Sequence, residues 1–170
     1  MARRSMPAVV ALLVAAAVAA AAEASTRYDA KTFTVTGTVL CQDCTKNWNA
    51  YAYNAKPIPG SVVAVMCLGR GKLVHYGSDA TDGKGAFNVE VPATVNGFEI
   101  DPLACHARLV SSGDAGCAVP TDFNGGLTGS ALSRPSQLYP GKVTFTVGPY
   151  YYTLPQCDLK GDDGCSKSSD

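Results

Sequence analysis

The chain has 170 residues, of which 46% are hydrophobic, 16% charged and 8% aromatic, with 14 basic and 14 acidic residues. This length suits one domain, and the apolar fraction excludes an intrinsically disordered chain. Because the charges balance, the chain has no net positive potential that would attract nucleic acid or anionic lipid. Two histidines exclude a histidine-rich metal site.

Residues 1–24 have the organisation of a secretory signal peptide. Arg3 and Arg4 precede an uncharged run rich in Ala and Val, and small residues at Ala22 and Ala24 form a cleavage signal. The run is short and Ala-rich for a spanning helix, so a retained signal anchor is the less favoured alternative. We expect cleavage after Ala24, or after Ala22, then export into an oxidising compartment, with no membrane association after cleavage.

Seven cysteines follow the predicted signal peptide: Cys41, Cys44, Cys67, Cys105, Cys117, Cys157 and Cys165. The cysteines of an exported protein usually form disulfides, and an odd number leaves one cysteine without a partner in the same chain. Cys165 is the natural odd one, because it lies in a polar tail, residues 160–170, that has no apolar pattern. It either stays free or forms an intermolecular disulfide, and the spacing of the other six leaves their pairing open.

Cys41 and Cys44 form a C-x-x-C motif with three interpretations. A redox site requires the pair at a helix N-terminus, whereas this pair follows a strand-like run. A zinc site requires a second close pair or histidines at ligand spacing, and only His106 lies beside another cysteine, Cys105. The third interpretation is therefore favoured: Cys41 and Cys44 each form a structural disulfide, with a different partner, from the same end of one strand.

Residues 31–40 alternate between apolar and polar side chains, which predicts a half-buried strand. Gly37 interrupts the apolar side and indicates a bulge or a close packing contact. Further strands are expected at 60–68, 72–76, 86–91, 103–110 and 142–148. Short strands separated by Gly and Pro turns indicate an all-β sandwich or closed barrel. We expect a linker at 25–31, one domain at 32–159 and a disordered tail at 160–170.

The sequence predicts no catalytic residue, no metal site and no cofactor. No G-x-S-x-G motif presents a serine, and the two histidines, His75 and His106, fall in strand-like runs that suit structural roles. Glu90 lies on the polar side of a strand. Turn formation accounts for the aspartates, and Asp79, Asp82 and Asp101 lack the repeated spacing of a calcium loop.

Two aromatic groups are candidates for carbohydrate contact. Trp48, Tyr51 and Tyr53 lie in a loop, and a run of three tyrosines follows the last strand: Tyr150, Tyr151 and Tyr152. Exposed rings of this kind stack on sugars, whereas buried ones would plug the end of a small barrel. The second alternative is favoured, because small cores use aromatic residues freely.

Residues 36–45, TGTVLCQDCT, resemble the N-terminal signature of the pollen Ole e I allergen and extensin family of secreted plant proteins. The other four cysteines match the family order: Cys67 ends an apolar strand, Cys105 and Cys117 form a middle pair, and Cys157 comes late. The resemblance covers about 33–157. The signature commonly has an aromatic residue at the place of Leu40 and arginine at that of Thr45. In this respect the chain looks closer to cell-wall relatives that are fused elsewhere to Pro-rich or arabinogalactan regions.

The resemblance implies a seven-stranded antiparallel β-structure with three disulfides, Cys41–Cys117, Cys44–Cys157 and Cys67–Cys105. It also implies a non-enzymatic role in the extracellular space or cell wall. Our leading hypothesis is a secreted structural or interaction protein that binds wall polysaccharides or glycoproteins through its aromatic loops. The alternatives are an inhibitor of an extracellular enzyme that presents the loop at 47–59, and a hydrolase that uses His75, His106 and Glu90.

Overall fold

The computed structural model describes residues 30–44, 54–69 and 71–158. The predicted signal peptide, most of the linker, the aromatic loop residues Trp48, Tyr51 and Tyr53, and the tail with Cys165 lie outside the described residues. Within the described ranges, no helix has both the length and the apolar character needed to cross a bilayer.

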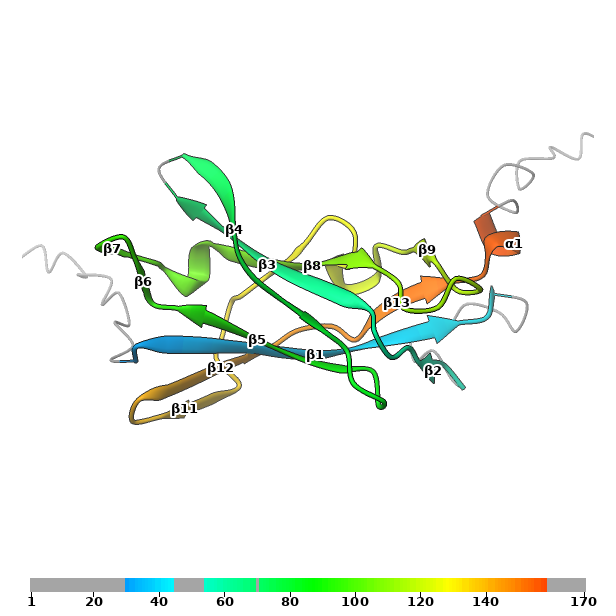
Figure 1. Cartoon of the computed structure of the whole chain (residues 1–170), viewed down its shortest axis with the longest axis horizontal. Helices are drawn as coiled ribbons and strands as arrows, with labels where there is room; N and C mark the ends of the chain where they lie inside the picture. The colour runs from blue at the N-terminus through cyan, green and yellow to red at the C-terminus, as the bar shows by residue number, and fades with distance from the viewer. Residues whose placement is uncertain (1–29, 45–53, 70, 159–170) are drawn as a thin grey trace, which may run out of the picture.

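The domain consists of two packed layers of strands (Figure 1), which confirms the all-β class. The first sheet has the order β11 (Gln137–Tyr139), β12 (Lys142–Thr146), β1 (Thr32–Gln42), β13 (Tyr150–Thr153) and β9 (Val119–Pro120), with β2 (Lys56–Pro57) and β5 (Ala86–Pro92) also paired to β1. The second sheet has the order β10 (Ser130–Ala131), β8 (Cys105–Ser111), β3 (Val62–Gly69) and β4 (Lys72–Ala80). The sheets pack as layers and do not close into a barrel.

Short elements complete the described part of the chain. A small hairpin pairs β6 (Thr94–Val95) with β7 (Phe98–Glu99). Two 3-10 turns, η2 (Pro102–Ala104) and η3 (Phe123–Gly125), precede β8 and β10, and α1 (Pro155–Asp158) follows β13. The strand expected at 103–110 therefore begins later, at Cys105, because Asp101 caps the turn by accepting a hydrogen bond from the Leu103 amide.

Most strand pairs are antiparallel, as the family resemblance implies, but the central strand β1 departs from this in two of its pairings. β1 runs parallel to β12, with Phe33 opposite Val143, and parallel to β13, with Val39 opposite Tyr150. The strand from the start of the domain thus lies between strands from its end. Alternation of apolar residues defines a buried side of a strand but carries no information about the direction of its neighbour.

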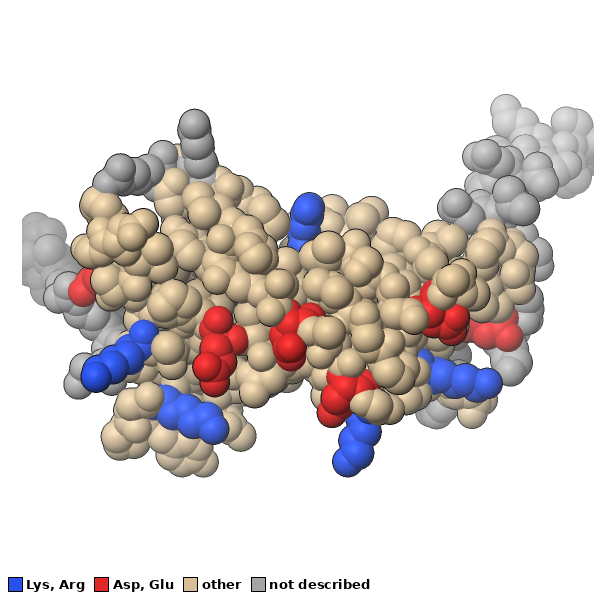
Figure 2. All heavy atoms as spheres, in the orientation of Figure 1, with Lys and Arg blue, Asp and Glu red and all other residues tan. Residues whose placement is uncertain are grey.

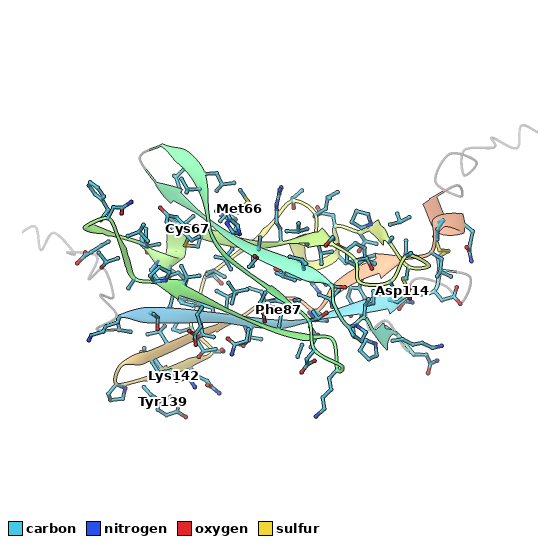
Figure 3. The ribbon with its side chains drawn as sticks, in the orientation of Figure 1. Met66, Cys67, Phe87, Asp114, Tyr139 and Lys142 are labelled. Atoms are coloured by element: carbon cyan, nitrogen blue, oxygen red, sulfur yellow. A yellow bond between two sulfur atoms is a disulfide. The ribbon has the colours of Figure 1, made fainter. Side chains whose placement is uncertain are left out.

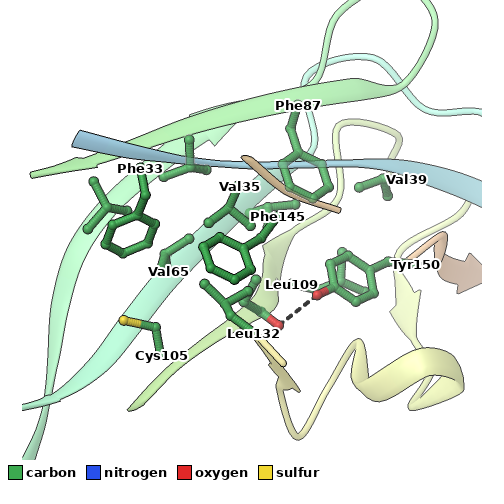
Figure 4. Close-up of a cluster of buried hydrophobic side chains, with 14 of the residues drawn as sticks. Phe33, Val35, Val39, Val65, Phe87, Cys105, Leu109, Leu132, Phe145 and Tyr150 are labelled. Atoms are coloured by element: carbon green, nitrogen blue, oxygen red, sulfur yellow. Dashed lines mark hydrogen bonds between the residues drawn. The ribbon is translucent and has the colours of Figure 1, made fainter. Parts of the chain in front are cut away.

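The core forms between the apolar sides of the two sheets (Figure 4). Phe33, Val35 and Val39 of β1 are buried, as their alternation predicts, and Val65 of β3 faces them from the second sheet. Phe33 packs edge to face on Phe145, with ring centroids 5.9 Å apart. The threonines of β1 consequently project from the outer side of the first sheet.

Gly37 lies in β1 at a point of close packing, which confirms one of its two predicted roles. A Cβ atom at this position would lie 2.5 Å from the Val147 carbonyl oxygen and 2.7 Å from the Phe87 ring. Residue 37 is therefore glycine because any side chain would overlap atoms that already fill the core.

Three disulfides cross-link the domain: Cys41–Cys117, Cys44–Cys157 and Cys67–Cys105. These are the pairs that the resemblance implies. The two cysteines of the C-x-x-C motif bond to different partners, so in this structure the motif is neither a redox pair nor a zinc half-site. Cys67 and Cys105 lie opposite each other on the paired strands β3 and β8.

Candidate functional site

A polar groove of about 250 Å³ lies on the outer side of the first sheet. Four neighbouring strands, β11, β12, β1 and β5, supply its floor. Its walls consist of hydroxyl, amide and charged side chains, from Thr34, Thr36, Asn88, Glu90, Ser136, Gln137, Lys142, Thr144 and Thr146. Because side chains of a strand alternate between faces, the apolar packing of β1 and β12 on the inner side places their threonines together here.

The groove residues form two rows across the strands. In one row Gln137 lies opposite Thr144, and Thr144 and Glu90 flank Thr34. In the next row Thr146 and Asn88 flank Thr36. Neighbouring residues of one row are close enough to share a ligand, because the side chains of directly opposite residues project from the same face.

Hydroxyl groups in the second row are already joined to one another. The Thr146 hydroxyl donates to Ser136 Oγ at 2.7 Å, and Thr36 Oγ1 lies 3.3 Å from Thr146 Oγ1. Ser136 Oγ donates in turn to the Thr144 carbonyl at 3.1 Å. These bonds fix the orientation of the hydroxyls, so a ligand meets an ordered row of donors and acceptors.

Thr144 is the exception in this network. Its side chain is only 6% exposed, and its Oγ1 atom has no hydrogen-bond partner among the described residues. An unpaired buried hydroxyl costs free energy, and such groups usually have a partner. Thr144 lines the groove but its Oγ1 is closed to solvent in the free protein, so a ligand in the groove would supply the partner once the side chain turns toward it.

Charged and aromatic groups lie at one end of the groove. Lys142 is opposite Tyr139 across the β11–β12 hairpin (Figure 3), and the Tyr139 ring is 62% exposed. Glu90 lies on the other side of β1 from Lys142. The groove thus has one charge of each sign, and the wider surface also intersperses the two signs in the view of Figure 2.

The structure buries the three tyrosines that were candidates for carbohydrate contact. Tyr150, Tyr151 and Tyr152 are 0%, 8% and 2% exposed. Tyr150 stacks on Phe87, and Phe123 covers Tyr151 edge to face. Burial raises the pKa of Tyr150 and of Tyr152 to about 12. This arrangement favours the alternative in which these rings complete the core. The other aromatic candidates, Trp48, Tyr51 and Tyr53, lie outside the described residues.

The residues of the hydrolase alternative are divided between the two layers. His75 on β4 and His106 on β8 belong to the second sheet, whereas Glu90 on β5 faces the groove of the first sheet. Of the aspartates that were considered and rejected as calcium ligands, Asp79 accepts a hydrogen bond from the Asn88 amide and Asp82 from the Lys84 and Ala86 amides. The Ala86 and Lys84 amides also hold the pKa of Asp82 below its usual value.

Sequence reasoning missed the groove, although part of its signal was present. The alternating threonines of β1 indicate a polar outer face, but that pattern fits any solvated strand. The additional information is spatial: the parallel pairing of β1 with β12 places Thr144 and Thr146 beside Thr34 and Thr36. No local pattern encodes that register.

Relatives of this chain are plant proteins. It is 32% identical over 127 residues to a pistil-specific extensin-like protein of Nicotiana tabacum, with 75% of this chain and 28% of that protein covered. It is 34% identical over 133 residues to proline-rich protein 3 of Arabidopsis thaliana, with 72% and 38% covered. The chain therefore spans well under half the length of these curated relatives. No protein-family model matches it.

A solved structure, the major plantain pollen allergen Pla l 1, matches with a TM-score of 0.48 and 20% identity, covering 73% of this chain and 94% of the allergen. The sheets and disulfides make the described part of the chain a disulfide-linked all-β domain, and the extensin-like and proline-rich relatives indicate a plant cell-wall or secreted protein. Its extensin-like and proline-rich relatives agree with the resemblance of the chain to the pollen Ole e I allergen and extensin family.

Proposed function

We propose that this domain binds neutral cell-wall polysaccharide in the polar groove of the first sheet, and that it acts by recognition and not by catalysis. The observation that carries the proposal is the Thr144 hydroxyl, which is buried and has no partner among the described residues, in a groove otherwise lined by oriented polar groups. The extensin-like and proline-rich names of its relatives support a location in the cell wall.

The chemistry of the groove suits a sugar chain. Each saccharide unit offers several hydroxyls that both donate and accept, which matches the rows of threonine, serine and amide side chains. Tyr139 adds an exposed ring at one end, and such rings present a flat apolar face with a polar tip. Lys142 and Glu90 give the groove no single sign of charge, which favours a neutral polysaccharide over a polyanionic one.

His75 and His106 lie on the second sheet, whereas Glu90 faces the groove of the first sheet. This separation supports a non-enzymatic role, because general acid–base catalysis requires its groups within hydrogen-bond reach of one substrate. The rigid, disulfide-linked sheets suit binding, since a preorganised surface loses little conformational freedom when it docks.

Affinity electrophoresis in gels that contain galactan, xylan or pectin tests the proposal. We expect retardation by a neutral polysaccharide, weaker retardation in Tyr139→Ala and Thr144→Val, and unchanged retardation in Leu138→Ala. Leu138 is the matched control, because it is similarly exposed and projects from the other side of the same strand. Equal mobility in every gel would refute polysaccharide binding. Retardation that survives both groove variants would place the site elsewhere, for example in the aromatic loop.

A further inference from the structure

Both histidines of the chain lie in one row with Met66 on the second sheet. The register places Met66 of β3 opposite His75 of β4 and also opposite His106 of β8. Directly opposite residues of antiparallel strands project from the same face. The three side chains therefore form a continuous row across three strands; Figure 3 labels the middle member, Met66.

Burial identifies this face as the outer one. The residues that flank Met66, Val65 and Cys67, are 0% and 1% exposed, and those that flank His106, Cys105 and Ala107, are each 0% exposed. Alternation along a strand then directs Met66 and His106 away from the core. His75 and His106 are exposed, and Met66 is partly exposed.

The spacing of the row suits one metal ion. Neighbouring strands lie about 4.8 Å apart, so the histidine Cα atoms are separated by roughly 10 Å with Met66 midway. Metal–imidazole bonds are about 2 Å long. Two imidazoles that lean inward from either side can therefore meet at a point above the thioether sulfur.

The donor set selects the metal. Among the described residues, no group of three or more His, Cys, Asp or Glu side chains suits a metal ion, which argues against a conventional zinc or calcium site. Two imidazole nitrogens and a thioether sulfur instead form a soft set, and thioether ligands select Cu(I). The adjacent row on one side is apolar, with Leu68 and Leu73 at 59% and 52% exposed, and apolar surroundings tune a metal site by limiting solvent access.

The other adjacent row contains Arg108, opposite Ala64. Its positive charge opposes any cation and opposes a divalent ion more strongly than a monovalent one. We propose that His75, Met66 and His106 form a binding site for Cu(I) on the outer face of the second sheet. This site is independent of the polar groove, which belongs to the first sheet.

Competition with a colorimetric Cu(I) chelator under anaerobic, reducing conditions that leave the disulfides intact tests the site. The parent protein carries Cys165→Ser, so that a thiol does not contribute. We expect one equivalent of Cu(I), affinity lower by about tenfold or more in Met66→Leu, and loss of binding in the double variant His75→Gln/His106→Gln. Arg108→Gln is the matched control from the same face, and it should bind at least as tightly as the parent.

A second measurement follows the sulfur directly. Met66 is the one methionine after residue 24, since the other two are Met1 and Met6. In the secreted chain, a methionine-methyl NMR spectrum should therefore show a single signal, and one equivalent of Ag(I), a redox-silent substitute for Cu(I), should shift it completely. An unshifted signal, equal affinity of Met66→Leu and parent, or complete retention of copper by the chelator would each overturn the proposal.

Discussion

The hydroxyl of Tyr150 on β13 donates a 2.7 Å hydrogen bond to the carbonyl oxygen of Ala107 on β8 (Figure 4). This bond crosses the core and links the two sheets. Tyr150 is fully buried, and its ring lies parallel to that of Phe87 with centroids 6.1 Å apart. The tyrosine thus combines apolar burial with a polar contact between layers.

Tyr150→Phe should lower the free energy of unfolding by about 1 kcal/mol, because the ring keeps its packing while one buried hydrogen bond is lost. Guanidinium denaturation of the two proteins measures the difference. Tyr139→Phe is the control, since that ring is 62% exposed, and it should have no effect. Equal stability of Tyr150→Phe and parent would show that the bond contributes nothing net.

The buried tyrosines also predict a loss of stability in alkali. Burial raises the pKa of Tyr150 and Tyr152 to about 12 in the folded protein, against about 10 in an unfolded chain. Between these values the folded state holds protons that the unfolded state has released, so stability is complete below pH 10 and falls as the pH rises toward 12. Ultraviolet titration should show two tyrosines that ionise late. In Tyr150→Phe/Tyr152→Phe the late phase should disappear, and a late phase that persists there would contradict the assignment.

All three adjacent tyrosines are buried, which a strand pattern alone does not predict, so carbohydrate contact stayed as an alternative beside the favoured buried role. In a strand with one solvated face, neighbouring residues alternate between buried and exposed. In β13 both faces are covered, because Tyr150 points into the core while Tyr151 packs against Phe123 of η3. The turn η3 covers the outer face of β13, and the sequence of the strand itself does not predict this contact.

Other features were predictable because they depend on local periodicity. The apolar residues Phe33, Val35 and Val39 identify the buried side of β1, and Gly37 identifies the point of close packing. The disulfide pairs could be inferred only through the family resemblance, since cysteine spacing alone leaves the connectivity open. The groove required the parallel register of β1 and β12, which brings residues more than a hundred positions apart to one face.

Gly37→Ala should destabilise the domain by about 1–3 kcal/mol, the usual cost of overpacking a core. The new methyl group would overlap the Val147 carbonyl and the ring of Phe87, which is itself buried in the core. Gly83→Ala is the matched control, because a Cβ there meets nothing within 4 Å, and it should change stability by less than about 0.5 kcal/mol. Thermal and guanidinium unfolding of both variants measure the contrast. A similar loss in both would mean that the packing around Gly37 adapts.

Thr144→Val and Thr153→Val form a pair that separates a binding hydroxyl from a structural one. Both side chains are buried, at 6% and 3% exposed, and both substitutions replace a hydroxyl by a methyl group of similar size. Thr153 donates a 2.8 Å hydrogen bond to the Gln42 carbonyl, so its removal should cost about 1 kcal/mol of stability. Thr144 Oγ1 has no such partner in the described chain, so Thr144→Val should leave stability unchanged or raise it by up to about 1 kcal/mol. Chemical denaturation of the free proteins decides between these outcomes. If Thr144→Val were instead as destabilising as Thr153→Val, the hydroxyl would already be satisfied without a ligand, and the observation that carries the proposed binding site would fail.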